Sequence, residues 1–282
     1  MFMIIWLASY PKSGNTWLRS IISSLLYTDS GEFKIELLKK IPQFPVERNF
    51  REFTNNFTDI HEIKKYWILA QNKINLDRKI KFLKTHHLNV NLNEFNFTNE
   101  ENSCATIYMV RDPRNLVNSI SNHFSKTHEE SKDFLISPGI LGAKREKISN
   151  TGHVVTLLGN WGEHYRFWKQ GSKKFLLIRY EDLINNPQKE LDKLIIFLKA
   201  FTTINVNEKK KEKIIKTTSF DSLKKIENEG LFKENVINHL NNKKVNFFNQ
   251  GPKNSWKNFL NEKIKDELEV KFKNEMRELN YL

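Results

Sequence analysis

The chain of 282 residues contains a single cysteine, Cys104. One cysteine excludes an internal disulfide bond and a cysteine-based zinc site, and we expect a reducing, cytoplasmic compartment. No segment approaches about eighteen uninterrupted apolar residues, so no transmembrane helix is expected. The apolar N-terminus lacks a basic leader and a small-residue cleavage site, and we interpret it as a core strand rather than a signal peptide.

Acidic residues are scarce relative to basic ones: 33 against 46, a net charge of +13. Binding to nucleic acid is one explanation of such a charge. The lysines are nevertheless spread along the chain, with only small clusters such as residues 209–211. An enzyme with an anionic ligand explains the sign of the charge, and we expect no nucleic-acid partner.

The sequence also lacks an internal repeat and a linker rich in Ser, Gly or Pro. Its length permits one large α/β domain or two small ones, and we predict a single domain over residues 1–282. Strand patterns occur at 3–8, 80–85, 105–110 and 175–179, and helical patterns at 113–125, 155–170 and 187–199. Residues 28–75 are irregular, with a helix expected near 60–72. This alternation predicts an α/β fold with a central, mostly parallel sheet flanked by helices.

The first strand leads into a polar loop, Tyr-Pro-Lys-Ser-Gly-Asn-Thr-Trp, and then into a helical pattern. In a strand–loop–helix arrangement the loop N–H groups and the helix N-terminus face an anion. The residues that would form this P-loop-like site are Lys12, Ser13, Gly14, Asn15 and Thr16. In the nucleoside-triphosphate loop, by contrast, lysine directly follows a glycine. The alternative is a simple turn with a solvated lysine.

Polar side chains follow each of the four strands at its C-terminal end. In open α/β sheets, ligands bind outside these carboxyl ends. We therefore expect Lys12, His86, Arg111 and Tyr180 to converge on one crevice.

Arg111 follows a strand, and Ser119 lies two turns into the next helix. A guanidinium and a hydroxyl so placed can bind a second phosphate. The alternative is a helix start capped by Asp112, with Arg111 in a surface ion pair.

The segment Lys84-Thr85-His86 ends another strand. A histidine with an ordinary pKa near 6.5 can accept a proton at neutral pH. Alternation along the strand places Lys84 and His86 on one side and His87 on the other. The alternative is a purely structural histidine.

These three segments together resemble motifs of the cytosolic-type sulfotransferases. Residues 10–17 are similar to the 5′-phosphosulfate loop YPKSGTTW, with Asn15 in place of the first threonine. Residues 110–119 are similar to the 3′-phosphate motif and residues 84–86 to the KTH segment. On these motifs the chain is identified as a bacterial-like member of that family.

The resemblance implies transfer of a sulfuryl group from 3′-phosphoadenosine 5′-phosphosulfate (PAPS) to a hydroxyl or amine, which leaves 3′,5′-adenosine bisphosphate (PAP). It implies that His86 is the general base, that Lys12 neutralises the leaving oxygen and that Lys84 assists. It also implies that Arg111 and Ser119 bind the 3′-phosphate, and that no metal is needed.

Aromatic segments resemble the adenine site of the family. Residues 179–183 are similar to its YED segment, in which Tyr180 would approach the adenine. Residues 218–220 are similar to its TSF segment, in which Ser219 borders the site and Phe220 stacks on the adenine together with Trp17. Residues 159–161 are similar to a helix start that flanks the acceptor site. Each aromatic taken alone has the simpler explanation of a core residue.

Residues 247–257 resemble the family's FxRKGxxGDWK segment, which clamps the 3′-phosphate. Gly251 is retained, but Asn249 and Gln250 replace the arginine and lysine. Since charge-assisted hydrogen bonds are the stronger ones, this change predicts weaker nucleotide binding unless Lys253 compensates. The family's dimer motif, KxxxTVxxxE, is absent, and we do not predict that dimer.

The acceptor is expected to be a small molecule, a glycan or a lipid, and no segment identifies it. Two other functions stay open at this point: a non-catalytic nucleotide-binding module and a nucleotide kinase of related fold.

Overall fold

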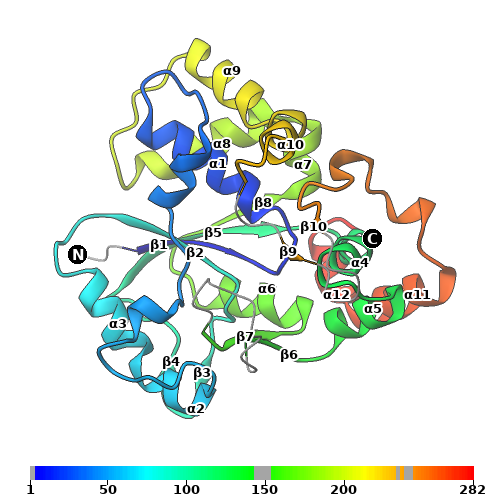
Figure 1. The fold of residues 1–282 in the computed structure, drawn as a ribbon, viewed down its shortest axis with the longest axis horizontal. Coiled ribbons are helices and arrows are strands. Elements are labelled where there is room, and N and C mark those ends of the chain that lie inside the picture. Colours follow the sequence, from blue (N-terminus) through cyan, green and yellow to red (C-terminus); the bar gives the residue numbers. More distant parts are fainter. Residues whose placement is uncertain (1–3, 143–153, 233–235, 238–243) are drawn as a thin grey trace. The chain divides into compact units, whose positions relative to one another are not determined.

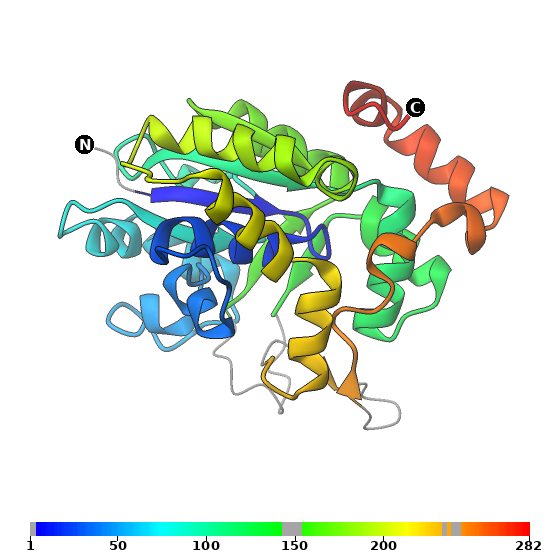
Figure 2. The same cartoon turned by 90° about the horizontal axis from the view of Figure 1, so that it is seen from above.

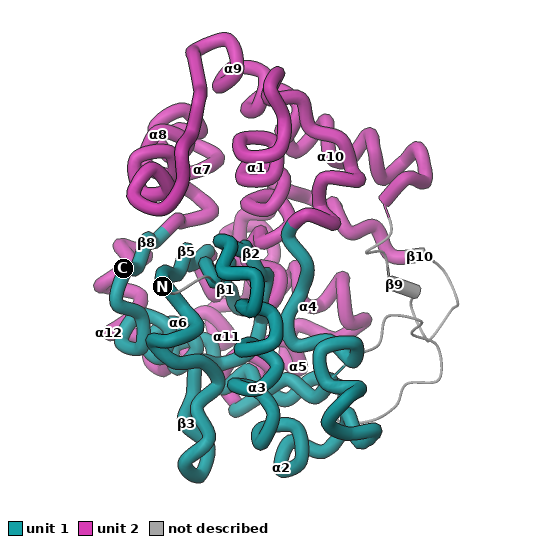
Figure 3. The backbone as a smooth tube through the Cα atoms, turned by 90° about the vertical axis from the view of Figure 1, so that its left-hand side faces the viewer, with its two compact units in different colours: residues 1–10, 41–109, 138–177 teal, residues 11–40, 110–137, 178–282 magenta. Residues whose placement is uncertain are grey.

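The structure, a computed structural model, describes residues 4–142, 154–232, 236–237 and 244–282 (Figure 1). The chain divides into two compact units, each assembled from separate stretches of sequence (Figure 3). Unit 1 comprises residues 1–10, 41–109 and 138–177, and unit 2 comprises residues 11–40, 110–137 and 178–282.

A four-stranded sheet with the order β2-β1-β5-β8 belongs to unit 1, apart from the last residues of β5 and β8. Its strands are β1 (Ile4–Ser9), β2 (Lys81–Thr85), β5 (Ser103–Val110) and β8 (Phe175–Arg179). Strand β1 pairs in parallel with both β2 and β5. Every residue of β1 is buried, which explains its continuous apolar run. The predicted α/β fold with a central parallel sheet is confirmed.

The remaining elements of unit 1 are short. They are η2 (Glu47–Asn49), α2 (Ile60–Ile63), η3 (Lys64–Tyr66), α3 (Trp67–Ile74), β3 (Asn91–Leu92), β4 (Phe95–Asn96), β6 (Gly139–Leu141), β7 (Thr156–Gly159) and α6 (Trp161–Gln170). The helix expected near 60–72 is present as α2, η3 and α3. Helix α6 packs on β1, where the rings of Trp6 and Trp168 lie 5.9 Å apart.

The helix predicted over 155–170 is wrong in its first third. Residues Thr156–Gly159 form β7, which pairs antiparallel with β6. Gly159 has a φ of 61°, and Asn160 caps α6 by a reciprocal exchange with Glu163. A glycine with left-handed backbone followed by a capping box marks the first turn of a helix, so α6 begins after Gly159. The apolar residues before it therefore lie outside the helix and pair as a strand.

Unit 2 consists mainly of helices. They are α1 (Asn15–Tyr27), η1 (Ile35–Lys40), α4 (Pro113–Phe124), α5 (His128–Ile136), α7 (Tyr180–Asn185), α8 (Pro187–Lys199), α9 (Glu208–Thr217), α10 (Phe220–Asn228), η4 (Gly251–Lys253), η5 (Trp256–Asn258), α11 (Glu262–Lys271) and α12 (Lys273–Glu278), with the short strands β9 (Val236–Ile237) and β10 (Lys244–Val245). Helix α9 lies against α1 and α8, and α11 lies against α4 and α5 (Figures 1 and 2).

Proline begins two of these helices, as the sequence predicts. Pro113 and Pro187 occupy the first turns of α4 and α8, where a missing N–H costs nothing. Within the described ranges, no helix combines the length and the apolar character needed to cross a bilayer.

Candidate active site

The loop after β1 turns the chain through two left-handed positions before α1 begins. Lys12 has a φ of 67° and Gly14 a φ of 104°. Gly14 is the N-cap of α1, and it brings no side chain to cap the first turn. The first N–H groups of a helix need an external partner, and they carry the positive end of its dipole. The loop therefore has the geometry of an anion site.

The side chains of this loop are turned inward. Ser13 is fully buried, and Asn15 and Thr16 are each 4% exposed. The Ser13 hydroxyl has no hydrogen-bond partner among the residues that the structure describes. An unpaired buried hydroxyl is costly, and an anionic ligand at the loop would satisfy it.

Lys12 contacts Phe247, the first residue of the segment 247–257, and His123, which no sequence motif singled out. Its ammonium lies 3.7 Å from the centroid of the Phe247 ring and 3.3 Å from His123 Nδ1. An ammonium can only donate, so Nδ1 of His123 accepts and is unprotonated. His123 lies one turn after Ser119 on α4, which is the one local signal of its role.

Arg111 and Ser119 form the predicted pair. Arg111 Nη1 donates to Ser119 Oγ at 3.1 Å, and the guanidinium lies 4.1 Å from the centroid of the Tyr180 ring. Trp17 meets Tyr180 edge-on at 5.5 Å. Four predicted residues, Trp17, Arg111, Ser119 and Tyr180, thus come together in unit 2.

The alternative explanation of residues 111–119 is a helix start capped by Asp112, with Arg111 in a surface ion pair. Only its first part is correct. Asp112 does cap α4, but its carboxylate pairs with Arg114 at 2.7 Å. Arg111 is 5% exposed and makes no surface ion pair; its Nε is buried without a partner among the described residues. A buried cation with an unmet donor is suited to an anionic ligand.

A half-buried carboxylate, that of Glu181, supports the same strand end. Glu181 accepts from the backbone N–H of Asp112 at 3.1 Å and from the hydroxyl of Tyr281 at 2.9 Å. Burial raises the pKa of Glu181. The C-terminal residues of the chain thus brace the segment that carries Arg111, a contact too distant in sequence to be predicted.

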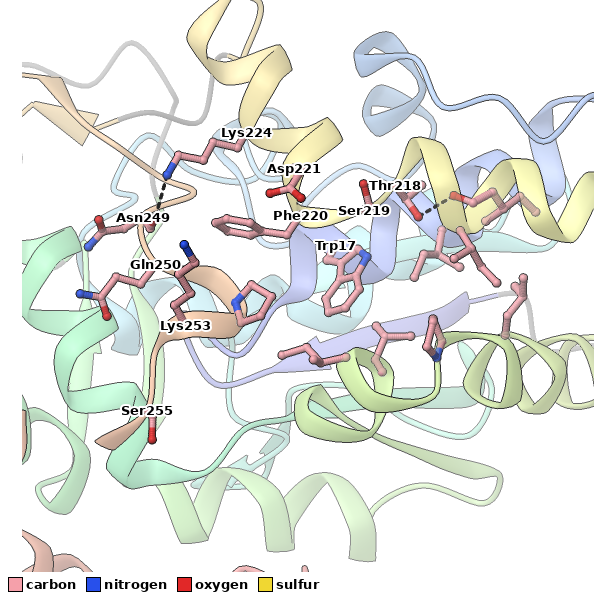
Figure 4. A pocket seen from close by; sticks show the side chains of 18 of the residues that line it. Trp17, Thr218, Ser219, Phe220, Asp221, Lys224, Asn249, Gln250, Lys253 and Ser255 are labelled. Carbon is pink, nitrogen blue, oxygen red and sulfur yellow. Dashed lines mark hydrogen bonds between the residues drawn. The ribbon is translucent and has the colours of Figure 1, made fainter. Parts of the chain in front are cut away.

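Unit 2 also contains a pocket of about 800 Å³, and Trp17 is one of the residues that line it (Figure 4). Its predicted lining residues are Trp17, Ser219, Phe220, Asn249 and Gln250, and its apolar wall includes Ile21, Leu183, Leu191 and Ile214. Three aromatic side chains, Trp17, Phe220 and Phe259, line the pocket, and such a lining is suited to a nucleobase.

Two predicted site residues have structural roles: Ser219, which lines the pocket, and Gly251, which is not among its lining residues. Ser219 is the N-cap of α10, and its Oγ accepts from the N–H of Ser222. Gly251 has a φ of 54°, and a Cβ there would overlap the ring of Phe220. The glycine therefore lets the backbone pass directly against the aromatic ring.

His86 lies in unit 1, one residue beyond the end of β2. Its Nδ1 is 2.7 Å from the carbonyl oxygen of Ser9. A carbonyl can only accept, so Nδ1 carries the proton and Nε2 is the basic nitrogen. This is the tautomer that a general base requires.

Two neighbouring histidines, His87 and His164, are fully buried in the core of unit 1. Burial lowers the pKa of His87 to about 3 and that of His164 to about 3. His87 stacks on Phe97 with centroids 4.2 Å apart, and His164 Nε2 donates to the backbone oxygen of His86. Thr85 and His87 are buried, whereas Lys84 and His86 are partly exposed, which is the predicted alternation.

The predicted site residues thus form two groups. Lys84 and His86 belong to unit 1, and all the others belong to unit 2. Their convergence on one crevice stays a prediction. Among the described residues, no cluster of His, Cys, Asp and Glu has the arrangement of a metal site.

Comparison with known proteins decides the family. The model of the sulfotransferase domain matches residues 4–280, and so spans both units. The chain belongs to the sulfotransferase family. The class of enzyme that the motifs predict is thereby confirmed.

Relatives of this sulfotransferase occur in animals and plants. It is 27% identical to sulfotransferase 1B1 of the dog, Canis lupus familiaris, over 96% of this chain and 83% of that protein. It is 26% identical to cytosolic sulfotransferase 13 of Arabidopsis thaliana, over 94% of this chain and 74% of that protein. These relatives do not bear on the expectation of a bacterial-like member, which stays a prediction.

Solved structures share the fold. Mouse sulfotransferase SULT7A1, complexed with PAP, superposes with a TM-score of 0.58 at 21% identity and covers 98% of this chain and 85% of its own. Retinol dehydratase, in complex with androsterone and the inactive cofactor PAP, gives 0.57 at 14% identity and covers 97% of this chain and 80% of its own.

The contact between Gly251 and Phe220 yields a test with a matched control. Gly230 also has a positive φ, 76°, but nothing lies within 4 Å of the Cβ it would carry. Gly230→Ala should cost about 1 kcal/mol from backbone strain alone. Gly251→Ala adds the overlap with the ring, and should cost on the order of 2–4 kcal/mol.

Urea unfolding of both variants measures the difference. Equal losses of stability in the two variants would show that the ring does not constrain Gly251.

Proposed function

We propose that this sulfotransferase transfers the sulfuryl group of PAPS to a hydroxyl or amine of its acceptor. The proposal is carried by two anion sites in unit 2 that accompany an aromatic pocket. The first anion site is the uncapped start of α1, and the second is the Arg111–Ser119 pair. PAPS carries a 5′-phosphosulfate, a 3′-phosphate and an adenine on one ribose, so its chemistry fits two anion sites beside an aromatic pocket.

The residues of the chain divide among the parts of the donor. The 5′-phosphosulfate is bound by Lys12, Ser13, Gly14, Asn15 and Thr16, through loop N–H groups and side-chain donors. The 3′-phosphate is bound by Arg111 and Ser119. The adenine is bound by Trp17, Tyr180, Ser219 and Phe220, with the segment Asn249–Gly251 closing the pocket.

Proton transfer is assigned to His86. Nε2 of His86 takes the proton of the acceptor as the acceptor oxygen or nitrogen bonds to sulfur. The bond from sulfur to the 5′-phosphate oxygen breaks in the same step. Donation from Lys12 neutralises the charge that develops on this oxygen, while Lys84 and the loop N–H groups stabilise the sulfuryl oxygens.

His87 and His164 are poor candidates for the base. Their pKa values, lowered to about 3 by burial, leave them neutral but too weakly basic to take a proton at pH 7. Both are also fully buried. This leaves His86 as the histidine of residues 84–87 that can reach an acceptor.

We propose a small-molecule acceptor; glycans and lipids that carry a hydroxyl also satisfy the chemistry. A cytoplasmic location accords with the relative that is named a cytosolic sulfotransferase. We also propose that residues 1–282 act as one sulfotransferase domain, because the family model spans both units.

Ligand-induced stabilisation tests the donor. PAP at 100 times its dissociation constant should raise the free energy of unfolding by about 2.7 kcal/mol, visible as a higher Tm. ATP with Mg²⁺ and duplex DNA should leave Tm unchanged. Stabilisation by ATP with Mg²⁺ but not by PAP would favour a nucleotide kinase and sink the proposal.

Substitution of His86 separates catalysis from binding. His86→Ala should leave PAP binding unchanged and reduce kcat by about 10²–10⁴, the usual contribution of a general base. His61→Ala is the control, since His61 is an exposed histidine of the same unit.

Turnover is followed by release of PAP from PAPS with a panel of phenols, alcohols and amines. Turnover of His86→Ala equal to that of His61→Ala would remove His86 from the mechanism. Binding of PAP by the wild-type chain without turnover of any acceptor would favour a non-catalytic nucleotide-binding module.

A further inference from the structure

The segment of residues 246–256 is held against α10 in unit 2. The carboxylate of Glu227 accepts from the N–H groups of Phe247 at 2.6 Å and Phe248 at 2.8 Å. One turn earlier on α10, Lys224 Nζ donates to the carbonyl of Asn249 at 3.1 Å (Figure 4). With Gly251 packed on Phe220, the segment therefore runs antiparallel to one face of α10.

The same segment is held on its other side by α4. Asn118 Nδ2 donates to Gln250 Oε1 at 2.9 Å and to Asn254 Oδ1 at 3.0 Å. Asn254 Nδ2 donates in turn to Ser119 Oγ at 3.1 Å. The segment is thus joined directly to the Arg111–Ser119 pair.

Neutral amides occupy the two positions where the family pattern has cations. The backbone carbonyl of Asn249 accepts from Lys224, and the side-chain oxygen of Gln250 accepts from Asn118. Neither residue brings a charge to the pocket. A doubly charged phosphate group needs cationic donors to offset the loss of its hydration.

Two lysines that border these amides bring the charge instead. Lys224 and Lys253 both line the pocket (Figure 4). Lys253 directly precedes Asn254, whose amide contacts Ser119. Neither ammonium forms an ion pair with a carboxylate of the described residues. Asp221 lines the same pocket, so one lysine would only cancel its charge, and two lysines are needed for a net positive charge.

We propose that Lys224 and Lys253 form a replacement cation pair that binds the 3′-phosphate of the nucleotide beside Arg111 and Ser119. The inference rests on the proposed function. Lysine is a compact charge on a flexible stem, so it can reach a phosphate from a backbone position that differs from that of an arginine. The charge removed at positions 249 and 250 is thereby restored from positions 224 and 253.

The test compares two nucleotides that differ only by the 3′-phosphate: PAP and adenosine 5′-monophosphate. The variants Lys224→Gln and Lys253→Gln remove the charge and keep a hydrogen-bond donor. Each should weaken PAP binding about tenfold and change binding of adenosine 5′-monophosphate less than twofold, measured by calorimetry at 50 mM salt. Lys→Arg at either position should retain PAP binding.

One matched control lies on α10 itself, and the other lies in η5, the element that follows η4 and its Lys253. Lys225 follows Lys224 on α10 with its side chain 78% exposed, and Lys257 is an exposed lysine of η5. Lys225→Gln and Lys257→Gln should leave both affinities unchanged. The quadruple variant with Asn249→Arg and Gln250→Lys added to the two Lys→Gln changes should regain PAP affinity.

The outcomes separate this inference from the proposed function. An unchanged ratio of PAP to adenosine 5′-monophosphate affinity in both Lys→Gln variants would overturn the cation pair, even if PAP stabilises the wild-type chain. An equal loss for both nucleotides would also overturn it, because the lysines would then act on the fold or the adenosine. Failure of PAP to bind the wild-type chain would instead contradict the proposed function.

Discussion

The left-handed backbone at Lys12 and Gly14 is the constraint on which the proposed donor site depends. It turns the chain from the end of β1 to the start of α1 within five residues, Tyr10 to Gly14. Because glycine at the N-cap offers no side chain, the helix N-terminus is kept for a ligand. A residue with a side chain at position 14 would be strained, because the φ of 104° lies in the left-handed region that favours glycine.

Electrostatic balance links this loop to the rest of unit 2. Arg111 is buried with Ser119 and Tyr180, and Lys12 rests on His123 and Phe247. Buried cations are stable only where hydrogen bonds, aromatic faces or anions compensate for lost water. The rings of Tyr180 and Phe247 supply part of that compensation, and a bound phosphate would supply more. The same cations therefore give the site its preference for an anionic ligand.

The predictable parts of the structure are those with local signals. Residues 175–179 and 187–199 form the predicted strand and helix at the predicted bounds. The strand at Thr156–Gly159 was misassigned, although Gly159 and the Asn160–Glu163 capping box were visible in the sequence. The contacts of Lys12 with Phe247 and of Glu181 with Tyr281 join residues far apart in sequence. Such contacts depend on tertiary packing, which no local pattern encodes.

A crystal structure of the chain with PAP is the measurement that tests the central claim most directly. The account predicts the 5′-phosphate on the N–H groups at the start of α1, the adenine between Trp17 and Phe220, and the 3′-phosphate within hydrogen-bond distance of Arg111 and Ser119. It also predicts His86 Nε2 facing the 5′ end of the nucleotide. A 5′-phosphate bound away from the loop, or an adenine outside the pocket of unit 2, would contradict the account.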